Sequence, residues 1–373
     1  MPLIIEGGRL PHWESELKRK GSASYGRHSS GFHKRARAQH LNIALINNMP
    51  DAALEDTELQ FFDLLDEASG DLPVYLKLYS LTGVPRTERG QRHLDSFYQS
   101  LDELWQSQLD GVIVTGTEPR QPKLQDEPYW KALTDIFDWA ERNTISTVLS
   151  CLAAHAGVLH SDGIPRHPLS DKQFGVFTFD KGADHQLTAG TTERIRFPHS
   201  RWNEVRADAL RSCGYTVLTQ SDDGGVDCFV KMKQKSLFVH FQGHPEYVAG
   251  TLLKEYRRDI KRFLRKERET YPTMPKGYFD EAGARLVSEF RESVICDPRE
   301  ELIDGFPDAT LAAALQRTWQ PSASAVYRNW LHYMASQKAD ISKLSVVPAI
   351  AENRARKHIP WPAARQKRGT YRH

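Results

Sequence analysis

From residue 41 to residue 160 the chain alternates between short apolar runs and amphipathic stretches. The apolar runs have strand length and lie at 41–47, 73–80, 110–119 and 146–151. Between and after them, apolar residues recur at helical spacing in the segments 53–68, 96–105, 129–143 and 152–160. Strands that alternate with helices in this way predict an α/β protein with a mostly parallel sheet and helices on both of its faces.

The pattern changes in the second half of the chain. Four strand-type runs follow one another with little helix between them, at 174–179, 215–220, 226–232 and 236–242. We interpret them as an antiparallel or mixed extension of the sheet. A helix is predicted at 251–267, a mixed segment with several prolines at 268–307, and a final helical pattern at 309–336.

Charge divides the chain into three parts. Residues 1–40 carry eight Lys or Arg against three Glu, and residues 351–373 carry seven against one, whereas the whole chain is only +2. We therefore predict a basic, flexible arm at 1–40, a single folded domain at 41–340 with a helical C-terminal segment, and a basic tail at 341–373. Neither end has the interleaved aromatic residues of a nucleic-acid binder, so solvated ends are favoured over nucleic-acid contact.

Composition narrows the class of protein. Hydrophobic residues at 39% and charged residues at 26% fit an ordinary soluble enzyme, and no run approaches the roughly 18 apolar residues of a membrane span. The N-terminus lacks a basic region followed by an apolar one, and the four cysteines form no CxxC pair, so we expect a reduced, cytoplasmic setting. No HExxH, Cys/His cluster, P-loop or GxGxxG is present, so no metal and no bound cofactor is predicted.

The segment STVLSCLAAHAG (146–157) places a cysteine where a strand turns into a helix. Cys151 follows the apolar run directly, and small residues follow it. Such a turn presents a nucleophile at the carboxyl edge of the sheet, and the helix N-terminus favours the thiolate. A buried packing cysteine is the alternative that this segment alone leaves open.

A base is predicted in the segment SLFVHFQGHPEY (236–247). Residues two apart in an extended chain share a face, so His244 and Glu246 can lie together at the end of a strand. That is the edge where Cys151 is expected, which supplies a base and its orienting acid. The alternative is a loop histidine beside a solvated glutamate.

An oxyanion site is a third hypothesis. The loop in VTGTEPRQP (114–122) follows the strand that precedes the cysteine strand in sequence. Its backbone N–H groups at Gly116 and Thr117, with that of Leu152, are the candidate donors to a developing oxyanion. A plain turn is the alternative.

Taken in order, these segments resemble the homoserine O-acyltransferase family (homoserine O-succinyltransferase), which has a glutamine-amidotransferase-like fold. The motifs are VTGTEP, SCLAAHAG, a lysine before FGVF, FPHSRWNEV, GHPEY with a later EYRRD, and NWLHYM. The resemblance implies a flavodoxin-like, class I glutamine-amidotransferase-like fold over about 41–340. It also implies a homodimer and small-molecule substrates.

The resemblance also implies roles for individual residues. Cys151 matches the nucleophile that carries the acyl group, His244 the general base, and Glu246 its partner. Three further positions match residues that contact substrate, namely Lys172, Ser200 and Arg258, the last as a fork for the carboxylate of an amino acid. A solvated loop, a turn and an exposed helix face are the respective alternatives.

The chain departs from the family pattern at several positions. Asp51 begins DAALEDTE where lysines are usual after Met-Pro, and Leu152 and His155 replace the usual Trp and Gln. Arg120 occupies a position associated with acyl choice, where Gly goes with succinyl and Glu with acetyl. Pairing of this cation with the free carboxylate of a succinyl group favours succinyl-CoA over acetyl-CoA, and a side chain that points to solvent is the alternative.

The function predicted from the sequence is therefore a cysteine-dependent, ping-pong transfer of a succinyl group from succinyl-CoA to the hydroxyl of homoserine, in methionine biosynthesis. An acetyl donor or another hydroxy amino acid, such as serine, remains open. Two other classes also remain: a glutamine amidotransferase, which would share the order Cys, His, Glu, and a non-catalytic protein that binds nucleic acid through its basic ends.

Overall fold

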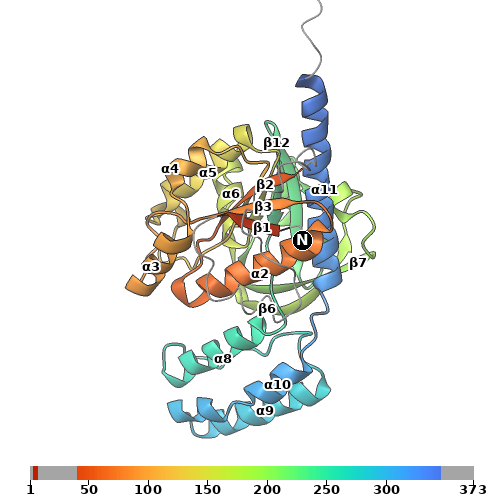
Figure 1. The fold of residues 1–373 in the computed structure, drawn as a ribbon. Helices are drawn as coiled ribbons and strands as arrows, with labels where there is room; N and C mark the ends of the chain where they lie inside the picture. Colours follow the sequence, from red (N-terminus) through yellow and green to blue (C-terminus); the bar gives the residue numbers. More distant parts are fainter. Residues whose placement is uncertain (1–2, 7–39, 346–373) are drawn as a thin grey trace, which may run out of the picture.

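A computed structural model describes residues 3–6 and 40–345 of the chain, and its centre is an eight-stranded sheet (Figure 1). The strands lie in the order β1-β3-β2-β4-β5-β12-β11-β8. Pairing is parallel from β1 to β12, and β11 and β8 add antiparallel strands at one edge. The bounds are β1 Leu3–Glu6, β2 Leu41–Ile46, β3 Val74–Tyr79, β4 Gly111–Val114, β5 Ser146–Ser150, β8 Thr216–Val217, β11 Cys228–Lys233 and β12 Ser236–Phe241. The predicted mostly parallel α/β fold is confirmed.

Helices cover both faces of this sheet, because neighbouring residues of each strand point to opposite sides. Ile43 and Leu45 of β2 pack in one core with residues of α2 (Asp51–Ser69) and α11 (Gln320–Ser345). Ala44 and Ile46 pack in a second core on the other face. The helices of that second face are α4 (Leu101–Gln106), α5 (Trp130–Asn143) and α6 (Leu152–Asp162). The segment expected as one helix at 96–105 contains the end of α3 (Glu88–Phe97) and most of α4.

A second, antiparallel sheet has the order β10-β9-β6-β7. Its strands are β6 (His167–Lys181), β7 (Arg194–Glu204), β9 (Thr219–Ser221) and β10 (Gly225–Val226). The expected extension of the main sheet is therefore correct for 236–242 and for most of 226–232. It is wrong for 174–179, which lies in the second sheet, and the segment 215–220 is divided between the two sheets. The physical reason is that β6 and β7 form a long ribbon whose apolar face, with Phe179 and Phe197, packs on the main core instead of pairing with its edge.

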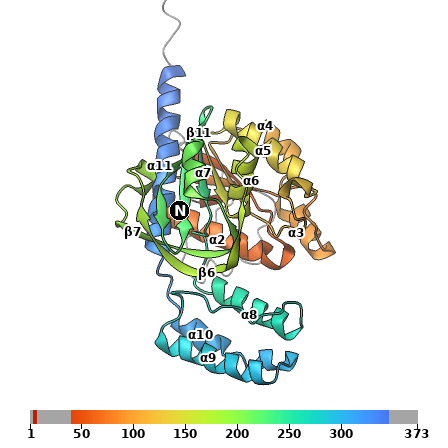
Figure 2. The same ribbon diagram turned by 180° about the vertical axis from the view of Figure 1, so that it is seen from behind.

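Four helical segments form a lobe with its own apolar core (Figure 2). They are α8 (Thr251–Leu264), α9 (Glu281–Cys296), η4 (Glu300–Gly305) and α10 (Asp308–Ala314). Tyr256, Val287 and Trp319 are buried in this core. The sequence predicted α8 and the last helices, but not α9. Its apolar residues Leu286, Phe290 and Val294 recur at helical spacing, but the prolines on either side led to its interpretation as a mixed segment. Its start is fixed locally by Asp280, whose carboxylate accepts a hydrogen bond from the N–H of Gly283.

The ends of the chain require one correction. Residues 1–40 were expected to form a flexible arm, but Leu3–Glu6 pair in parallel with β3, and Leu3 is buried. The apolar run LIIE explains this, since it can cover the sheet edge. The rest of the arm, at 7–39, and most of the predicted tail, at 346–373, lie outside the described residues.

The remaining short elements are η2 (Leu124–Asp126), η3 (Gln186–Thr188) and α7 (Ala207–Ser212). Within residues 3–6 and 40–345, no helix has both the length and the apolar character that crossing a bilayer requires. Because β2, β4, β5 and β12 are parallel, their carboxyl ends meet at one edge of the main sheet, which is where α/β proteins bind ligands.

Candidate active site

Cys151 lies at the junction of β5 and α6 in a strained backbone conformation. Its φ is 53° and its ψ is −112°, values that non-glycine residues rarely adopt. Its N–H donates to the carbonyl of Phe241 at 2.7 Å, and its own carbonyl accepts from the N–H of Ala154 at 3.0 Å. The chain therefore turns sharply between strand and helix, and the side chain is only partly buried, as the sequence predicted for a nucleophile.

His244 lies next to this turn because β12 is the neighbour of β5 in the sheet. Ser150 pairs with Phe241, so the residues that follow the two strands leave the sheet side by side. The N–H of His244 donates to the carbonyl of Pro198 at 2.8 Å. Its ring stacks on Tyr247, with ring centroids 4.2 Å apart. Both contacts fix the ring, which is 7% exposed.

Glu246 orients the imidazole. Its Oε1 atom lies 2.8 Å from Nδ1 of His244 and accepts a longer hydrogen bond from Oγ of Ser150 at 3.4 Å. A proton on Nδ1 that is donated to Glu246 leaves Nε2 for exchange with a reacting group. The two side chains share one face at the end of the strand, as the spacing of two residues predicted.

Cys151 and His244 interact directly. Burial opposes the charged imidazolium, yet the pKa of His244 is raised well above its usual value by the charges of Cys151 and Glu246 and by side-chain hydrogen bonds with both. The sulfur and the imidazole, which are far apart in sequence, therefore meet at one rim of the sheet. This arrangement is typical of a cysteine nucleophile with its base.

Gly116 and Leu152 meet beside Cys151. A Cβ atom on Gly116 would lie 3.0 Å from the backbone nitrogen of Leu152 and 3.4 Å from the carbonyl oxygen of Ser150. The N–H of Leu152 is at the first position of α6, where no intrahelical acceptor exists. The absence of a side chain at 116 thus leaves room in front of this N–H. Thr117 follows, half-buried.

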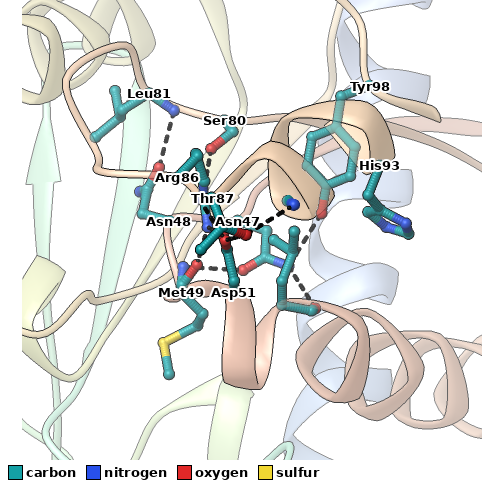
Figure 3. Close-up of polar contacts among 12 residues, drawn as sticks. Asn47, Asn48, Met49, Asp51, Ser80, Leu81, Arg86, Thr87, His93 and Tyr98 are labelled. Atoms are coloured by element: carbon teal, nitrogen blue, oxygen red, sulfur yellow. Dashed lines mark hydrogen bonds and ion pairs between the residues drawn. The ribbon is translucent and has the colours of Figure 1, made fainter. Parts of the chain in front are cut away.

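The loop after β2 contacts both the loop after β3 (Figure 3) and the loop that contains Gly116. Asn48 donates through its backbone N–H to Oγ1 of Thr115 at 2.8 Å, and its side chain accepts from the N–H of Leu81 at 3.0 Å. Arg86 binds the carbonyl of Met49 and lies 3.2 Å from Oδ1 of Asp51. Asp51, at the start of α2, therefore ties the loop after β2 to the loop after β3.

Lys172 and Ser200 both contact one carboxylate that the sequence analysis missed, Glu255 of α8. Oγ of Ser200 donates a short hydrogen bond to Oε2 of Glu255, and Nζ of Lys172 lies 3.4 Å from the same atom. Lys172 also pairs with Asp259 at 2.8 Å. Burial alone would raise the pKa of Glu255, but the charges of Lys172 and Arg258 and its hydrogen bonds lower it, so the carboxylate stays ionised.

Glu255 connects this cluster to the base. Its Oε1 accepts from the hydroxyl of Tyr247 at 2.7 Å, and Tyr247 is the residue that stacks on His244. Arg258 is half-exposed and lies 3.3 Å from Asp259 and 3.7 Å from Glu255. The structure thus brings Lys172, Ser200 and Arg258 into one cluster. Glu255 was detectable only as an acid three residues before Arg258 on a predicted helix.

Arg120 lies apart from these contacts. Its side chain is exposed, and its backbone N–H donates to Oε1 of Glu127 at 2.5 Å, as that of Gln121 does at 2.7 Å. Glu127 is buried, so this carboxylate fixes the loop that follows Gly116. No contact of the structure assigns the exposed Arg120 guanidinium to an acyl group.

Two other arginines that the sequence did not single out lie within electrostatic reach of Cys151. Arg166 follows α6 and is half-buried. Burial lowers its pKa, although the charges of Tyr129, Glu127 and Cys151 act to raise it. Arg201 of β7 is buried. Its burial lowers its pKa, although the charges of Cys151, Glu204 and Asp227 act to raise it. Among the described residues, neither arginine forms an ion pair with a carboxylate. Both therefore favour negative charge at the site.

The comparison with known proteins agrees with this geometry. A family model described as homoserine O-succinyltransferase matches residues 25–341. The chain belongs to this family.

Curated relatives carry the same name. The homoserine O-succinyltransferase of Rhodopseudomonas palustris is 42% identical over 315 residues, which are 84% of this chain and 94% of the relative. That of Methylorubrum extorquens is 43% identical over 304 residues, covering 81% of this chain and 89% of the relative. The resemblance stated from the motifs is confirmed: this homoserine O-succinyltransferase family member is an acyltransferase, and an amidotransferase or a nucleic-acid binder is not favoured.

Solved structures similar to this family member are more distant. A glutamine amidotransferase from Thermotoga maritima is 12% identical, covers 79% of this chain and 98% of its own, and has a TM-score of 0.43. A glutamine amidotransferase from Methylobacillus flagellatus is 14% identical, with coverages of 79% and 95% and a TM-score of 0.41.

Proposed function

We propose that this chain transfers a succinyl group from succinyl-CoA to the hydroxyl of homoserine through a thioester on Cys151. The observation that carries the proposal is the direct interaction of Cys151 with His244, which Glu246 orients at 2.8 Å, in a chain of this family. A nucleophile with a base and an orienting acid is what acyl transfer by a covalent intermediate requires.

In the first half-reaction, the Cys151 thiolate attacks the thioester carbonyl of succinyl-CoA. The N–H of Leu152 and the backbone N–H groups of Gly116 and Thr117 are the proposed donors to the oxyanion, and the closeness of Gly116 to the nitrogen of Leu152 supports this. The bond from the carbonyl carbon to the CoA sulfur then breaks, and His244 gives its proton to the departing CoA thiolate. The products are succinyl-Cys151, CoA and a neutral imidazole that still donates to Glu246.

In the second half-reaction, neutral His244 takes the proton of the acceptor hydroxyl. The oxygen attacks the acyl carbon, the bond to the Cys151 sulfur breaks, and O-succinylhomoserine leaves. This restores the thiolate and the imidazolium. The raised pKa of His244 suits this state, because the charges of Cys151 and Glu246 stabilise the protonated ring between turnovers.

Recognition of the donor is assigned to Arg166 in place of Arg120, the position that the sequence indicated. Arg166 is half-buried near Cys151 without a carboxylate partner among the described residues, whereas Arg120 is exposed. The hydroxyl of Tyr129 near Arg166 is buried and has no hydrogen-bond partner in the described structure. A guanidinium and a free hydroxyl fit the second carboxylate of a succinyl group, which acetyl lacks.

Recognition of the acceptor is assigned to the Glu255 cluster. Glu255 is an ionised, deeply buried carboxylate that would take the ammonium group of an amino acid, and Arg258 beside it would take the carboxylate. Tyr247 contacts both Glu255 and His244, so an amino acid held there would direct its side-chain hydroxyl toward the base. The length of that side chain separates homoserine from serine.

Intact-mass analysis after incubation with succinyl-CoA tests the function. We expect one added succinyl group, which disappears on addition of homoserine as O-succinylhomoserine forms. Cys151→Ala should show no addition, and Cys296→Ala, which removes an exposed cysteine, is the matched control. Acetyl-CoA as donor and serine or threonine as acceptor are compared in the same assay. An equal succinyl addition on Cys151→Ala would refute the nucleophile assignment.

We further propose that the enzyme is cytoplasmic, forms a homodimer, binds only small-molecule substrates and holds no resident cofactor. Size-exclusion chromatography with light scattering tests the homodimer. Salt-dependent binding of nucleic acid without any acyl transfer would instead favour a role for the basic ends.

A further inference from the structure

Two fully buried polar side chains lie beneath the turn that carries His244. They are Asp227, between β10 and β11, and His199 of β7. Neither takes part in the proposed acyl transfer. A buried carboxylate is costly unless its hydrogen bonds are made, so its position under this turn requires an explanation.

Asp227 and Pro198 bind three consecutive backbone N–H groups of the turn. Oδ1 of Asp227 accepts from the N–H of Gly243 at 2.9 Å, and its backbone carbonyl accepts from the N–H of Gln242 at 3.0 Å. The carbonyl of Pro198 accepts from the N–H of His244 at 2.8 Å. The backbone is thus fixed at the residue that carries the base.

His199, which Arg201 holds, packs against Asp227 from the other side. Nε2 of His199 lies 3.2 Å from Oδ1 of Asp227, and Nε of Arg201 donates to Nδ1 of His199 at 3.2 Å. Because Nδ1 accepts, the proton of a neutral ring lies on Nε2, which is close to Asp227 but makes no well-aligned hydrogen bond within the described residues. Burial lowers the pKa of His199 to about 4, so the ring is neutral near neutral pH.

The contact between the turn and this pair is too close for any side chain at 243. A Cβ atom on Gly243 would lie 2.6 Å from Nε2 of His199 and 2.8 Å from both Oδ1 of Asp227 and the carbonyl oxygen of Pro198. The backbone of the turn therefore packs directly against these polar atoms, and they fix its distance from β7.

We propose that Asp227 is a positioning residue, which holds the Gly243–His244 turn so that the imidazole faces Cys151. His199, which Arg201 holds, packs against Asp227. The proposal rests on His244 being the base of the proposed function. It assigns the effect of Asp227 to the hydrogen bond with Gly243, so an oxygen at the same place should suffice without the charge.

Alkylation of Cys151 by iodoacetamide across pH 5 to 9, with kcat and KM for acyl transfer, tests this. In Asp227→Ala we expect two quantities to fall by about 100-fold: the rate of Cys151 alkylation near neutral pH, and kcat. The KM should change little. A small misplacement of a catalytic group has effects of this size. Asp227→Asn keeps an oxygen for Gly243 and should stay within about threefold of the native chain. Asp223→Asn, an ion-paired surface residue of the same hairpin, is the control.

Three results would overturn the proposal: native alkylation and kcat in Asp227→Ala, equal losses in the Asn and Ala variants, or a loss confined to KM. If Asp227→Ala does not fold, as judged by circular dichroism, Gly243→Ala replaces it. Its methyl group displaces the turn, and the same loss of alkylation is expected, with native alkylation as the refuting result. Alkylation needs no acyl donor, so fast alkylation without succinyl transfer would refute the proposed function and leave the positioning role intact.

Discussion

Glu246 and His244 are joined by a single carboxylate oxygen, Oε1, which lies 2.8 Å from Nδ1 of the imidazole. The other oxygen of Glu246, Oε2, is buried and makes no hydrogen bond within the described part of the chain. The main hydrogen bond of the Glu246 carboxylate is therefore the one that orients the imidazole ring. Its charge is also one of the causes that raise the pKa of His244.

Replacing Glu246 by Gln should lower the pKa of His244. The raised value means that the imidazolium is stabilised in the folded protein and persists as pH rises above the usual range, so removing one stabilising charge moves the titration down. We expect kcat to fall by about 100-fold or more, the range of a general base. NMR titration of labelled histidine, assigned with His244→Asn, measures the shift.

Glu281→Gln, at a carboxylate exposed in the first turn of α9, is the control and should leave the His244 titration unchanged. An unchanged titration in Glu246→Gln would contradict the pairing.

Gly116→Ala should slow acylation of Cys151 with little loss of stability. The added methyl group would lie 3.0 Å from the nitrogen of Leu152, in front of the N–H that is proposed to stabilise the oxyanion. Loss of one such donor typically costs about 100-fold in rate. The burst of free CoA in a rapid-mixing experiment measures the step. Gly305→Ala, where a Cβ meets nothing within 4 Å, is the control, and a native burst in Gly116→Ala would rule out this oxyanion site.

Arg166→Gln should raise KM for succinyl-CoA by about tenfold, because a charge-assisted hydrogen bond to the distal carboxylate is lost. The kcat/KM for acetyl-CoA, which has no such carboxylate, should change little. Arg120→Ala is the matched variant at the exposed position, and it should leave both donors unaffected. A raised KM for succinyl-CoA in Arg120→Ala, with none in Arg166→Gln, would instead show that Arg120 binds the distal carboxylate, as the sequence indicated.

Glu255→Gln should raise KM for homoserine by about tenfold or more, since the ammonium group loses its charged partner. The succinylation of Cys151, which precedes acceptor binding, should keep its native rate. Lys254→Ala on the same helix removes an exposed side chain paired with Asp56 and serves as control. Slow succinylation with an unchanged KM would show that Glu255 acts on the nucleophile instead.

The sequence predicted the central strands of the main sheet, β2, β3, β4, β5, β11 and β12, since each is a clear apolar run, but it missed the edge strand β1. Cys151 at a strand-to-helix turn and His244 with Glu246 at the end of a strand were visible for the same reason. The antiparallel strand β7 and the helix α9 were missed. Arg194–Glu204 contains a proline and charged residues, so it gives no clear strand period. Glu281–Cys296 does have apolar residues at helical spacing, but the prolines that flank it led to its interpretation as a mixed segment.

Spacing along the chain therefore predicted the fold class and the places of the candidate nucleophile and base, because local geometry fixes where a strand ends and which residues share a face there. The supporting residues depended on tertiary structure alone. Glu255 meets Lys172 and Ser200 only where α8 crosses β6 and β7, and Asp227 meets Gly243 only because β11 and β12 pair. Contacts between segments so far apart leave no periodic signal, and packing of the folded chain is what decides them.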